Sequence, residues 1–219
     1  MQFDVKNIIF DFGNILIDLD IERTWASLRH FIGDDYVQKL KTAYPNGDIF
    51  IDFEIGKISE QTFLETLRSV SDHPLSIRQI KEAWNAMLLT IKPERFDMLL
   101  RLRENYKVFL LSNTNETHYN FVDGYLRTVY GFDIQHFSTT FFDKAYYSHE
   151  INLRKPNLDI YEFVLQDARL KAEETLFIDD ISANTEGAKQ VGMNVYTHRV
   201  GVEIVETMDS LLKKHLTHV

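Results

Sequence analysis

The chain has 219 residues, of which 44% are hydrophobic, 26% charged and 13% aromatic. This balance is typical of a soluble globular protein with a sizeable core, and it excludes disordered, collagenous and low-complexity classes. Lys and Arg total 24 against 33 Asp and Glu, so the net charge of −9 argues against nucleic acid or membrane as a partner. The absence of cysteine excludes disulfides and thiolate metal sites, and it leaves His and carboxylates as candidate metal ligands.

The first residues, MQFDVKNIIFDFG, are not typical of a secretory leader. The sequence contains no run of about 18 uncharged apolar residues, the length typical of a membrane-spanning helix. We therefore expect a cytoplasmic protein. The sequence does not indicate an oligomeric state.

Five short apolar runs that end at polar clusters predict strands at residues 7–10, 108–111, 145–147, 176–178 and 194–197. Helical patterns lie between them. One helix begins at Pro93, a second begins near Asn157 with Phe163 among its inward residues, and a third begins after Ser182 and ends at Gly192. This alternation predicts an α/β fold, a doubly wound parallel sheet with a Rossmann-like core.

A long insertion separates the first two predicted strands. Ser112 lies 101 residues after Asp11, whereas a strand–helix–strand unit needs only about 30, so roughly 70 residues are surplus. The surplus contains three apolar stripes at helical spacing, which are Ile21/Trp25/Leu28/Ile32, Phe63/Leu67/Val70 and Ile77/Ile80/Trp84/Met87. We predict two domains: an α/β core of residues 1–18 and 92–219, and an inserted helical cap of residues 19–91.

Four polar clusters follow four of the predicted strands. In a parallel sheet these positions are the carboxyl ends of the strands, where open α/β sheets bind ligands. The clusters are Asp11-Phe12-Gly13-Asn14, Ser112-Asn113-Thr114-Asn115, Arg154-Lys155-Pro156 and Asp179-Asp180-Ile181-Ser182-Ala183-Asn184. Together they supply a lone carboxylate, a hydroxyl with free backbone amides, a cation and a pair of carboxylates.

This set of groups suits phosphoryl transfer through a covalent aspartyl-phosphate. One carboxylate attacks phosphorus, a lysine and oriented N–H groups hold the phosphoryl oxygens, and a cation offsets the negative charge. Clustered aspartates without His or Cys are typical ligands of a hard cation, so Mg²⁺ is the expected cofactor.

The four motifs, in this order across nearly the whole chain, resemble those of the haloacid dehalogenase-like hydrolases. Residues 19–91 look like the helical cap of that family's small-molecule phosphatases. Phe53-Glu54-Ile55-Gly56-Lys57-Ile58-Ser59, Trp84-Asn85 and Gly13-Asn14 also resemble the branch that includes bacterial α-D-glucose-1-phosphate phosphatase.

The resemblance implies a role for each motif residue. It makes Asp11 the nucleophile and Lys155 the lysine that neutralises both the nucleophile and the phosphate. It places the phosphate against Phe12, Gly13, Ser112, Asn113 and Lys155. It places the metal against Asp11, the backbone carbonyl of Gly13, Asp179 and Asp180, with Asn184 in support.

The implied activity is Mg²⁺-dependent hydrolysis of a small phosphomonoester, a sugar phosphate in particular. One position departs from the family pattern, because most of its phosphatases have a second Asp where this chain has Gly13. That Asp protonates the leaving group, and general acid–base catalysis contributes roughly 10²–10⁴-fold in rate. Gly13 therefore predicts a preference for substrates with good leaving groups, such as anomeric phosphates.

Two other functions remain open. A 2-haloacid dehalogenase-type hydrolase keeps the nucleophilic Asp without needing a metal, although Asp179, Asp180 and Lys155 favour phosphate over halide. A catalytically weak binding or regulatory protein of the same fold is the second, because Gly13 lacks the acid. For Trp84, His118 and His149 we expect packing roles before substrate contact.

Overall fold

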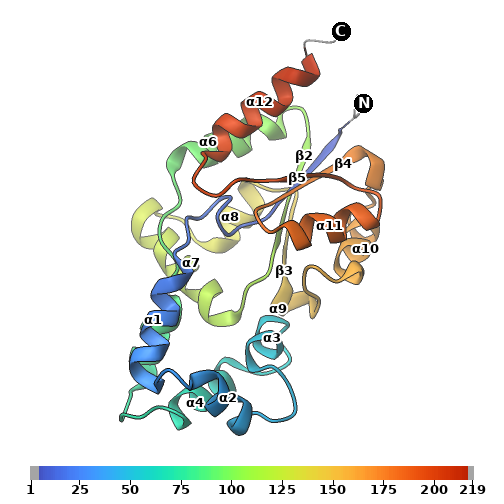
Figure 1. Ribbon diagram of the computed structural model, residues 1–219. Helices are drawn as coiled ribbons and strands as arrows, with labels where there is room; N and C mark the ends of the chain where they lie inside the picture. The colour runs from blue at the N-terminus through green and yellow to red at the C-terminus, as the bar shows by residue number, and fades with distance from the viewer. Residues whose placement is uncertain (1–4, 217–219) are drawn as a thin grey trace.

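A computed structural model describes residues 5–216 of the chain. In this part of the chain five strands form one parallel sheet in the order β3-β2-β1-β4-β5 (Figure 1). Their bounds are β1 (Asn7–Phe10), β2 (Lys107–Ser112), β3 (Lys144–Tyr147), β4 (Thr175–Asp179) and β5 (Asn194–Thr197). The strand predictions are confirmed, each to within one residue at either end.

Strand β1 lies at the centre of the sheet because both of its faces are apolar. Ile8, Ile9 and Phe10 are all fully buried, and an uninterrupted apolar run is typical of a strand covered on both sides. The register places Phe10 beside Leu110 of β2 and Ile178 of β4. The residues that follow these three strands therefore emerge at the same edge of the sheet.

Helices cover both faces of the sheet, which confirms the doubly wound α/β fold. On one face a single apolar cluster contains residues of α6 (Pro93–Arg103), α7 (Glu116–Tyr130), α8 (Ile134–Thr140) and α12 (Ile204–Leu216). On the other face α10 (Leu158–Asp167) and α11 (Ser182–Gln190) pack in a second cluster. Two short elements precede α10 and β4, namely α9 (Ser148–Ile151) and a 3₁₀ turn, η1 (Ala172–Glu174).

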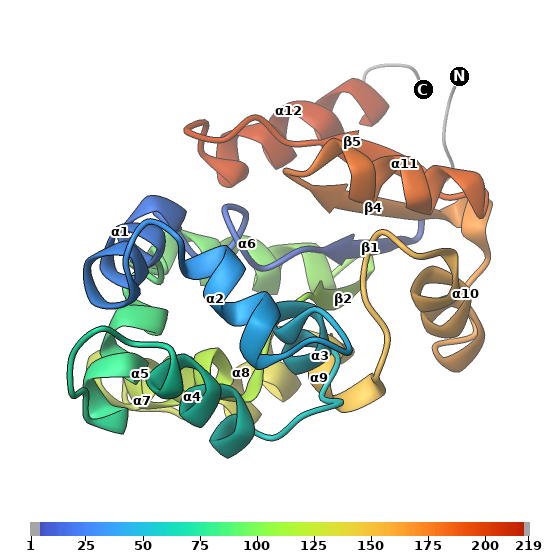
Figure 2. The same cartoon turned by 60° about the horizontal axis from the view of Figure 1, so that its bottom comes forward.

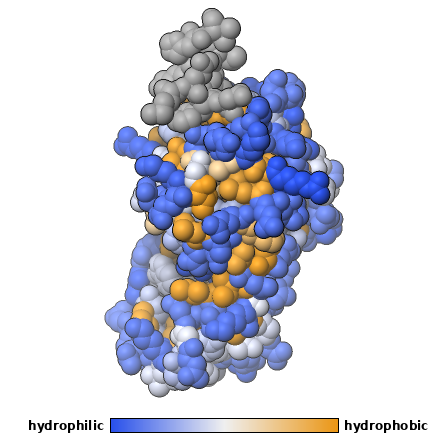
Figure 3. All heavy atoms as spheres, turned by 90° about the vertical axis from the view of Figure 1, so that its right-hand side faces the viewer, coloured by the Kyte–Doolittle hydropathy of each residue, from blue (hydrophilic) through white to orange (hydrophobic). Residues whose placement is uncertain are grey.

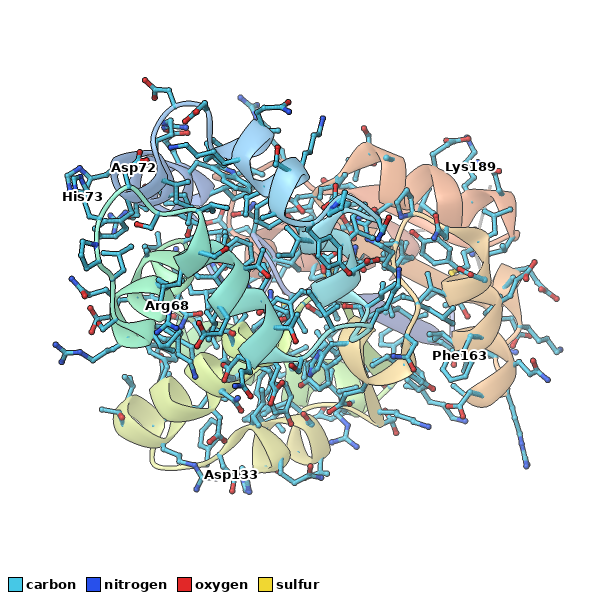
Figure 4. All side chains as sticks on the ribbon, turned by 90° about the horizontal axis from the view of Figure 1, so that it is seen from below. Arg68, Asp72, His73, Asp133, Phe163 and Lys189 are labelled. Carbon is cyan, nitrogen blue, oxygen red and sulfur yellow. The ribbon has the colours of Figure 1, made fainter. Side chains whose placement is uncertain are left out.

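One inward residue of α10 was predicted wrongly. Phe163 is 36% exposed and lies on the outer side of its helix (Figure 4). The fully buried residues of this helix are Ile160, Tyr161 and Val164, which lie on one face of a helix with 3.6 residues per turn. Tyr161 therefore takes the inward position, and the Phe163 ring meets the edge of Tyr146 instead.

The inserted segment forms five helices beyond the carboxyl ends of the strands (Figures 1 and 2). They are α1 (Ile21–Ile32), α2 (Tyr36–Ala43), α3 (Ile49–Glu54), α4 (Glu60–Ser69) and α5 (Ile77–Asn85). The three predicted stripes fall on α1, α4 and α5 and share one apolar cluster that includes Leu28, Phe63 and Trp84.

The domain boundaries at 18/19 and 91/92 stay a prediction. Residues 1–4 and 217–219 of the predicted core lie outside the described residues. The described residues contain no helix with both the length and the apolar character that a membrane crossing requires.

The two segments that join the cap to the core run side by side. Asp18 N–H donates to Thr90 O at 2.9 Å, and Leu89 N–H donates to Asp18 O at 3.0 Å. Buried Arg95 holds this pair to the core, because its guanidinium donates to Asp18 Oδ1 at 2.7 Å and to Glu203 Oε1 at 2.9 Å. The cap thus connects through a short, anchored ladder.

The face that carries α10 and α11 is mainly hydrophilic, and its apolar residues form separate patches (Figure 3). Apolar atoms ordinarily contribute roughly 55–60% of the accessible surface of a soluble protein, so such patches do not by themselves mark a site. The polar clusters that follow the strands lie elsewhere, at the carboxyl edge of the sheet.

Candidate active site

A buried lysine joins two aspartates at the carboxyl edge of the sheet. Lys155 is 1% exposed, and its Nζ donates to Asp11 Oδ1 at 2.6 Å, to Asp179 Oδ2 at 2.7 Å and to Leu111 O at 2.9 Å. A buried ammonium group is tolerated only when it is paired and hydrogen-bonded. The fold therefore brings together charged residues from the ends of β1 and β4 and from the loop before α10.

Three carboxylates lie close enough to share one metal ion. Asp11, Asp179 and Asp180 each offer an oxygen, and these oxygens lie within 4.8 Å of one another. Asp180 Oδ2 accepts a hydrogen bond from Asn14 Nδ2 at 2.9 Å. Three carboxylates beside one lysine leave excess negative charge, and carboxylate oxygens are the donors that Mg²⁺ prefers. The donor set therefore fits this cation.

The pKa shifts in the cluster have two opposing causes. Burial raises the pKa of Asp11 to about 7, although the nearby Lys155 ammonium lowers it. Burial also raises the pKa of Asp180, against the hydrogen bond from Asn14. For Lys155, burial lowers the pKa, but attraction to Asp11 and Asp179 outweighs it, so the net shift is upward. The lysine stays cationic, and a bound divalent cation would favour the ionised form of the carboxylates.

Asp179 differs from the other two carboxylates. It is fully buried, and both of its oxygens accept hydrogen bonds from Asn184 Nδ2 at 3.0 Å. Oδ1 also accepts a hydrogen bond from the Ile181 N–H at 2.8 Å, whereas Oδ2 accepts one from Lys155 Nζ. These bonds hold Asp179 behind the lysine, in a position that suits orienting Lys155.

The loop after β2 is tied to the loop that carries Lys155. The Asn113 side chain donates to Lys155 O at 2.9 Å and accepts from the Lys155 N–H at 2.9 Å. The neighbouring Ser112 hydroxyl is buried but makes only a long contact of 3.5 Å with Asn113 O. It is therefore available to bind a phosphoryl oxygen.

A cavity of about 400 Å³ lies between this edge of the sheet and the cap helices. Its size is suitable for a small molecule. The site residues expected from the sequence lie together at one end, because the lining includes Asp11, Phe12, Gly13, Ser112, Asn113, Lys155 and Asp180. Asp179 and its oxygens lie beneath this surface.

The turn after α3 binds the cap to the core. Ser148 Oγ donates to Glu54 O at 2.6 Å, and Asn152 Nδ2 donates to Ile55 O at 2.8 Å. The Glu54 carboxylate accepts from Arg154 Nε at 2.7 Å, and both side chains line the cavity. Sequence analysis did not predict these contacts, because a lone serine or asparagine carries no recognisable motif and Glu54 lies 100 residues before Arg154.

Gly56 completes this contact because no larger residue fits there. Its φ is +68°, and a Cβ at this position would lie 2.2 Å from the His149 carbonyl oxygen. The His149 ring lies against Tyr119 and Tyr147, which agrees with the packing role expected for it.

Trp84 and His118 form a second link between cap and core. The rings stack with centroids 5.1 Å apart, and His118 Nε2 lies 3.2 Å from Trp84 O. Trp84 Nε1 donates to Asn115 Oδ1 at 3.3 Å, while the Asn115 amide lies 3.2 Å from His118 Nδ1. Burial lowers the pKa of His118 to about 4, so the ring is neutral at pH 7. Trp84 and His118 both pack, as expected, and both also line the cavity.

Comparison with known proteins points to one family. A model of the haloacid dehalogenase-like hydrolases matches residues 5–192. The D-ribitol-5-phosphate phosphatase of Bacteroides thetaiotaomicron is 29% identical over 199 residues, which cover 91% of this chain and 94% of that protein. A sesquiterpene phosphatase of Aspergillus oryzae is 27% identical over 209 residues, covering 95% and 94% respectively.

A solved structure gives the same result. A HAD family enzyme of Bacteroides thetaiotaomicron, in complex with magnesium and inorganic phosphate, superposes with a TM-score of 0.77 at 33% identity and covers 91% of this chain and 96% of that one. The family model, this identity over most of both chains and the clustered motif residues agree. The chain belongs to the haloacid dehalogenase-like hydrolases.

Proposed function

We propose that the protein is a Mg²⁺-dependent phosphatase that hydrolyses a small phosphomonoester through an aspartyl-phosphate on Asp11. The observation that carries this proposal is the meeting of Asp11, Lys155 and Asp180 in one cavity. The 33% identical enzyme whose structure contains magnesium and inorganic phosphate supports both the cofactor and the ligand class.

The reaction has two balanced steps. In the first, an Asp11 carboxylate oxygen attacks phosphorus, the bond between phosphorus and the ester oxygen breaks, and the departing alkoxide takes a proton from water. In the second, water attacks the phosphorus of the acyl phosphate, which releases inorganic phosphate and regenerates Asp11. Bound Mg²⁺ would offset the negative charge that gathers between the carboxylates and the phosphoryl group.

Each site residue has a proposed role. Lys155 holds one Asp11 oxygen, which leaves the other free to attack, and it neutralises the phosphoryl group. The Ser112 hydroxyl and the backbone N–H groups of Phe12, Gly13 and Asn113 bind phosphoryl oxygens. Asp11, Asp180 and the Gly13 carbonyl hold the metal, and Asp179 contributes by orienting Lys155 or through a water.

The position of the missing general acid lies against a side chain from the junction of cap and core. A Cβ placed on Gly13 would lie 2.7 Å from Leu19 Cδ1 and 4.0 Å from Asp11 Oδ2. Leu19, at the junction of cap and core, therefore lies against this position, and its terminal methyl group would have to shift to admit an acidic side chain. Water must then supply the proton to the leaving group.

The relatives support two classes of substrate. The D-ribitol-5-phosphate phosphatase supports the sugar or polyol phosphate expected from the motifs, whereas the sesquiterpene phosphatase supports an apolar ester. The three clustered carboxylates argue against the dehalogenase alternative, because halide displacement needs no cation. Asp11, Lys155 and Asp180 lie together at one site, which argues against a merely regulatory protein even though Gly13 lacks the acid.

A trapping experiment tests the proposal. The protein is mixed with p-nitrophenyl phosphate and Mg²⁺, quenched in acid and reduced with borohydride, which converts an aspartyl-phosphate to homoserine. We expect homoserine at position 11, and nitrophenol release that stops in excess chelator. Turnover in chelator, or a phosphoryl group trapped at another residue, would show that the mechanism is wrong.

A further inference from the structure

The cap side of the cavity is apolar. Eight side chains from the cap and its junction with the core line it, namely Leu19, Ile21, Trp25, Phe50, Ile51, Trp84, Met87 and Leu88. Glu54 is the charged residue that the cap adds to this lining. We call the eight side chains the apolar wall. It faces the end of the cavity where the leaving group must lie when the phosphoryl group contacts Asp11.

The aromatic part of the wall is a self-supporting cluster. Trp25 meets Phe50 edge-on at 5.5 Å, Phe50 stacks on Trp84 at 5.6 Å, and the two tryptophans lie 6.4 Å apart. Each ring limits the movement of the other two. The wall therefore presents a preformed apolar surface, and an apolar ligand would not need to order it on binding.

Most of the polar side chains that line the same cavity already have partners. Asn14 binds Asp180 and the Leu19 N–H, and Asn113 binds both backbone groups of Lys155. Asn115 and His118 bind each other and Trp84, Asn184 binds Asp179, and Glu54 pairs with Arg154. The Thr114 hydroxyl and the outer atoms of the Glu54–Arg154 pair keep some capacity for a ligand. A polyol would find few other partners here, and each hydroxyl that loses water without gaining a partner costs binding free energy.

The rim of the cavity continues the apolar surface. Ile21 of α1 is 47% exposed, Ile51 of α3 is 36% exposed, and Ile181, in the loop between β4 and α11, is 53% exposed. All three line the cavity, although they come from both the cap and the core. Exposed apolar side chains that gather around an opening indicate a binding surface.

We infer that the leaving group of the natural substrate is an aliphatic or aromatic alcohol whose apolar body packs against this wall and extends toward the isoleucine rim. This inference rests on the proposed function for the position of the phosphoryl group. It differs from the sugar phosphate expected from the motifs, because the wall offers ring faces and methyl groups where a sugar needs hydrogen-bond partners.

Two esters of equal length test the inference directly. n-Pentyl phosphate and D-ribitol 5-phosphate are both primary esters of five-carbon alcohols and differ only in the hydroxyl groups of ribitol. We expect kcat/KM to be at least about tenfold higher for the pentyl ester. Along a series from propyl to hexyl phosphate, each methylene should raise kcat/KM about threefold to fourfold until the chain leaves the cavity. If kcat/KM does not rise with chain length, or if it is higher for ribitol phosphate than for the pentyl ester, the inference is wrong.

A matched pair of variants locates the effect. Ile51→Asn places a polar amide on the rim, whereas Val129→Asn makes a similar change at a 54% exposed position on α7 that does not line the cavity. We expect the first variant to reduce the gain per methylene and the second to leave it unchanged. Equal behaviour of the two variants would mean that the isoleucine rim does not contact the leaving group.

A binding measurement separates this inference from the proposed function. Propyl- and hexylphosphonate are not hydrolysed, and calorimetry with and without Mg²⁺ reports their affinity alone. Tighter binding of the hexyl compound would support the packing of the leaving group against the apolar wall even if no ester were hydrolysed. If p-nitrophenyl phosphate is hydrolysed with Mg²⁺ but the two phosphonates bind equally, the phosphatase proposal stands and the wall proposal is wrong.

Discussion

The two ends of the cavity are built in opposite ways. At the phosphate end, Asp11, Lys155 and Asp179 are buried charges held by hydrogen bonds of 2.6–2.7 Å. At the cap end, the lining consists mainly of rings and methyl groups from α1, α3 and α5. A buried charge network fails when one member is removed, whereas an apolar wall loses free energy in proportion to the area that it covers. We therefore expect abrupt effects at the first end and graded effects at the second.

The largest loss of activity at the phosphate end should come from Asp11→Asn. The amide is nearly isosteric with the carboxylate but is not nucleophilic, so turnover should fall at least about 1,000-fold while the protein remains folded. Steady-state assays together with thermal unfolding check this. The control is Asp20→Asn, at an exposed ion pair with Arg23, which should retain normal rates. A variant at position 11 with a tenth of the wild-type activity would be incompatible with the mechanism.

Asp180→Asn tests the metal at the same end. It removes one of three carboxylates, so Mg²⁺ should bind more weakly and turnover should fall about 100-fold at limiting Mg²⁺, with partial recovery at high concentration. A second readout is stability, because a ligand that binds only the folded state raises Tm. Mg²⁺ should raise the Tm of the wild type more than that of the variant. An equal rise in both would place the ion elsewhere.

Gly56→Ala tests the docking of the cap. The methyl group would clash with the His149 carbonyl, and φ of +68° is unfavourable for alanine. We expect a loss of roughly 1–3 kcal/mol in stability and a lower kcat/KM, measured by urea unfolding and by assay. Gly124→Ala is the control, since no atom lies within 4 Å of its added Cβ and alanine favours the helix. If both variants behave alike, the turn after α3 does not position the cap.

Gly13→Asp asks whether Leu19 blocks a general acid. Alone, the substitution should have the smaller effect, because the Leu19 methyl group must first shift to make room for the carboxylate. Combined with Leu19→Ala, it should raise the turnover of primary alkyl phosphates about tenfold or more, and that of p-nitrophenyl phosphate less, since a good leaving group needs no proton. Rates measured over a range of leaving groups give the comparison. If the rates for all leaving groups change by the same factor, the new carboxylate alters the structure of the site and does not act as a general acid.

The smallest effect concerns His118, which links the two ends. Burial lowers its pKa to about 4 from an ordinary value near 6.5. The unfolded chain therefore binds the proton more tightly, so this contribution to stability is complete above pH 6.5 and declines as the pH falls toward 4. Urea unfolding at pH 7.5 and 4.5 should show a loss from this group of roughly 1–3 kcal/mol. His118→Gln should lose less over the same interval, and an identical loss would exclude His118 as the source.

Much of the phosphate end was predictable because its residues follow strands directly. Asp11, Ser112 and Asp180 each end an apolar run or lie directly beyond one, and parallel strands bring their carboxyl ends to one edge. The positions of β1, β2 and β4 were accurate because a strand buried on both faces is an uninterrupted apolar segment.

The leaving-group end was decided only by tertiary structure. The pairing of Glu54 with Arg154, the fit of Gly56 against His149 and the closeness of Leu19 to Gly13 depend on how the cap sits on the core. Helical periodicity shows that a residue such as Trp84 faces an apolar interior, but it does not show whether that interior is the packed core of the cap or the wall of a cavity. The same apolar pattern serves both purposes, and only the packing of helices distant in sequence distinguishes them.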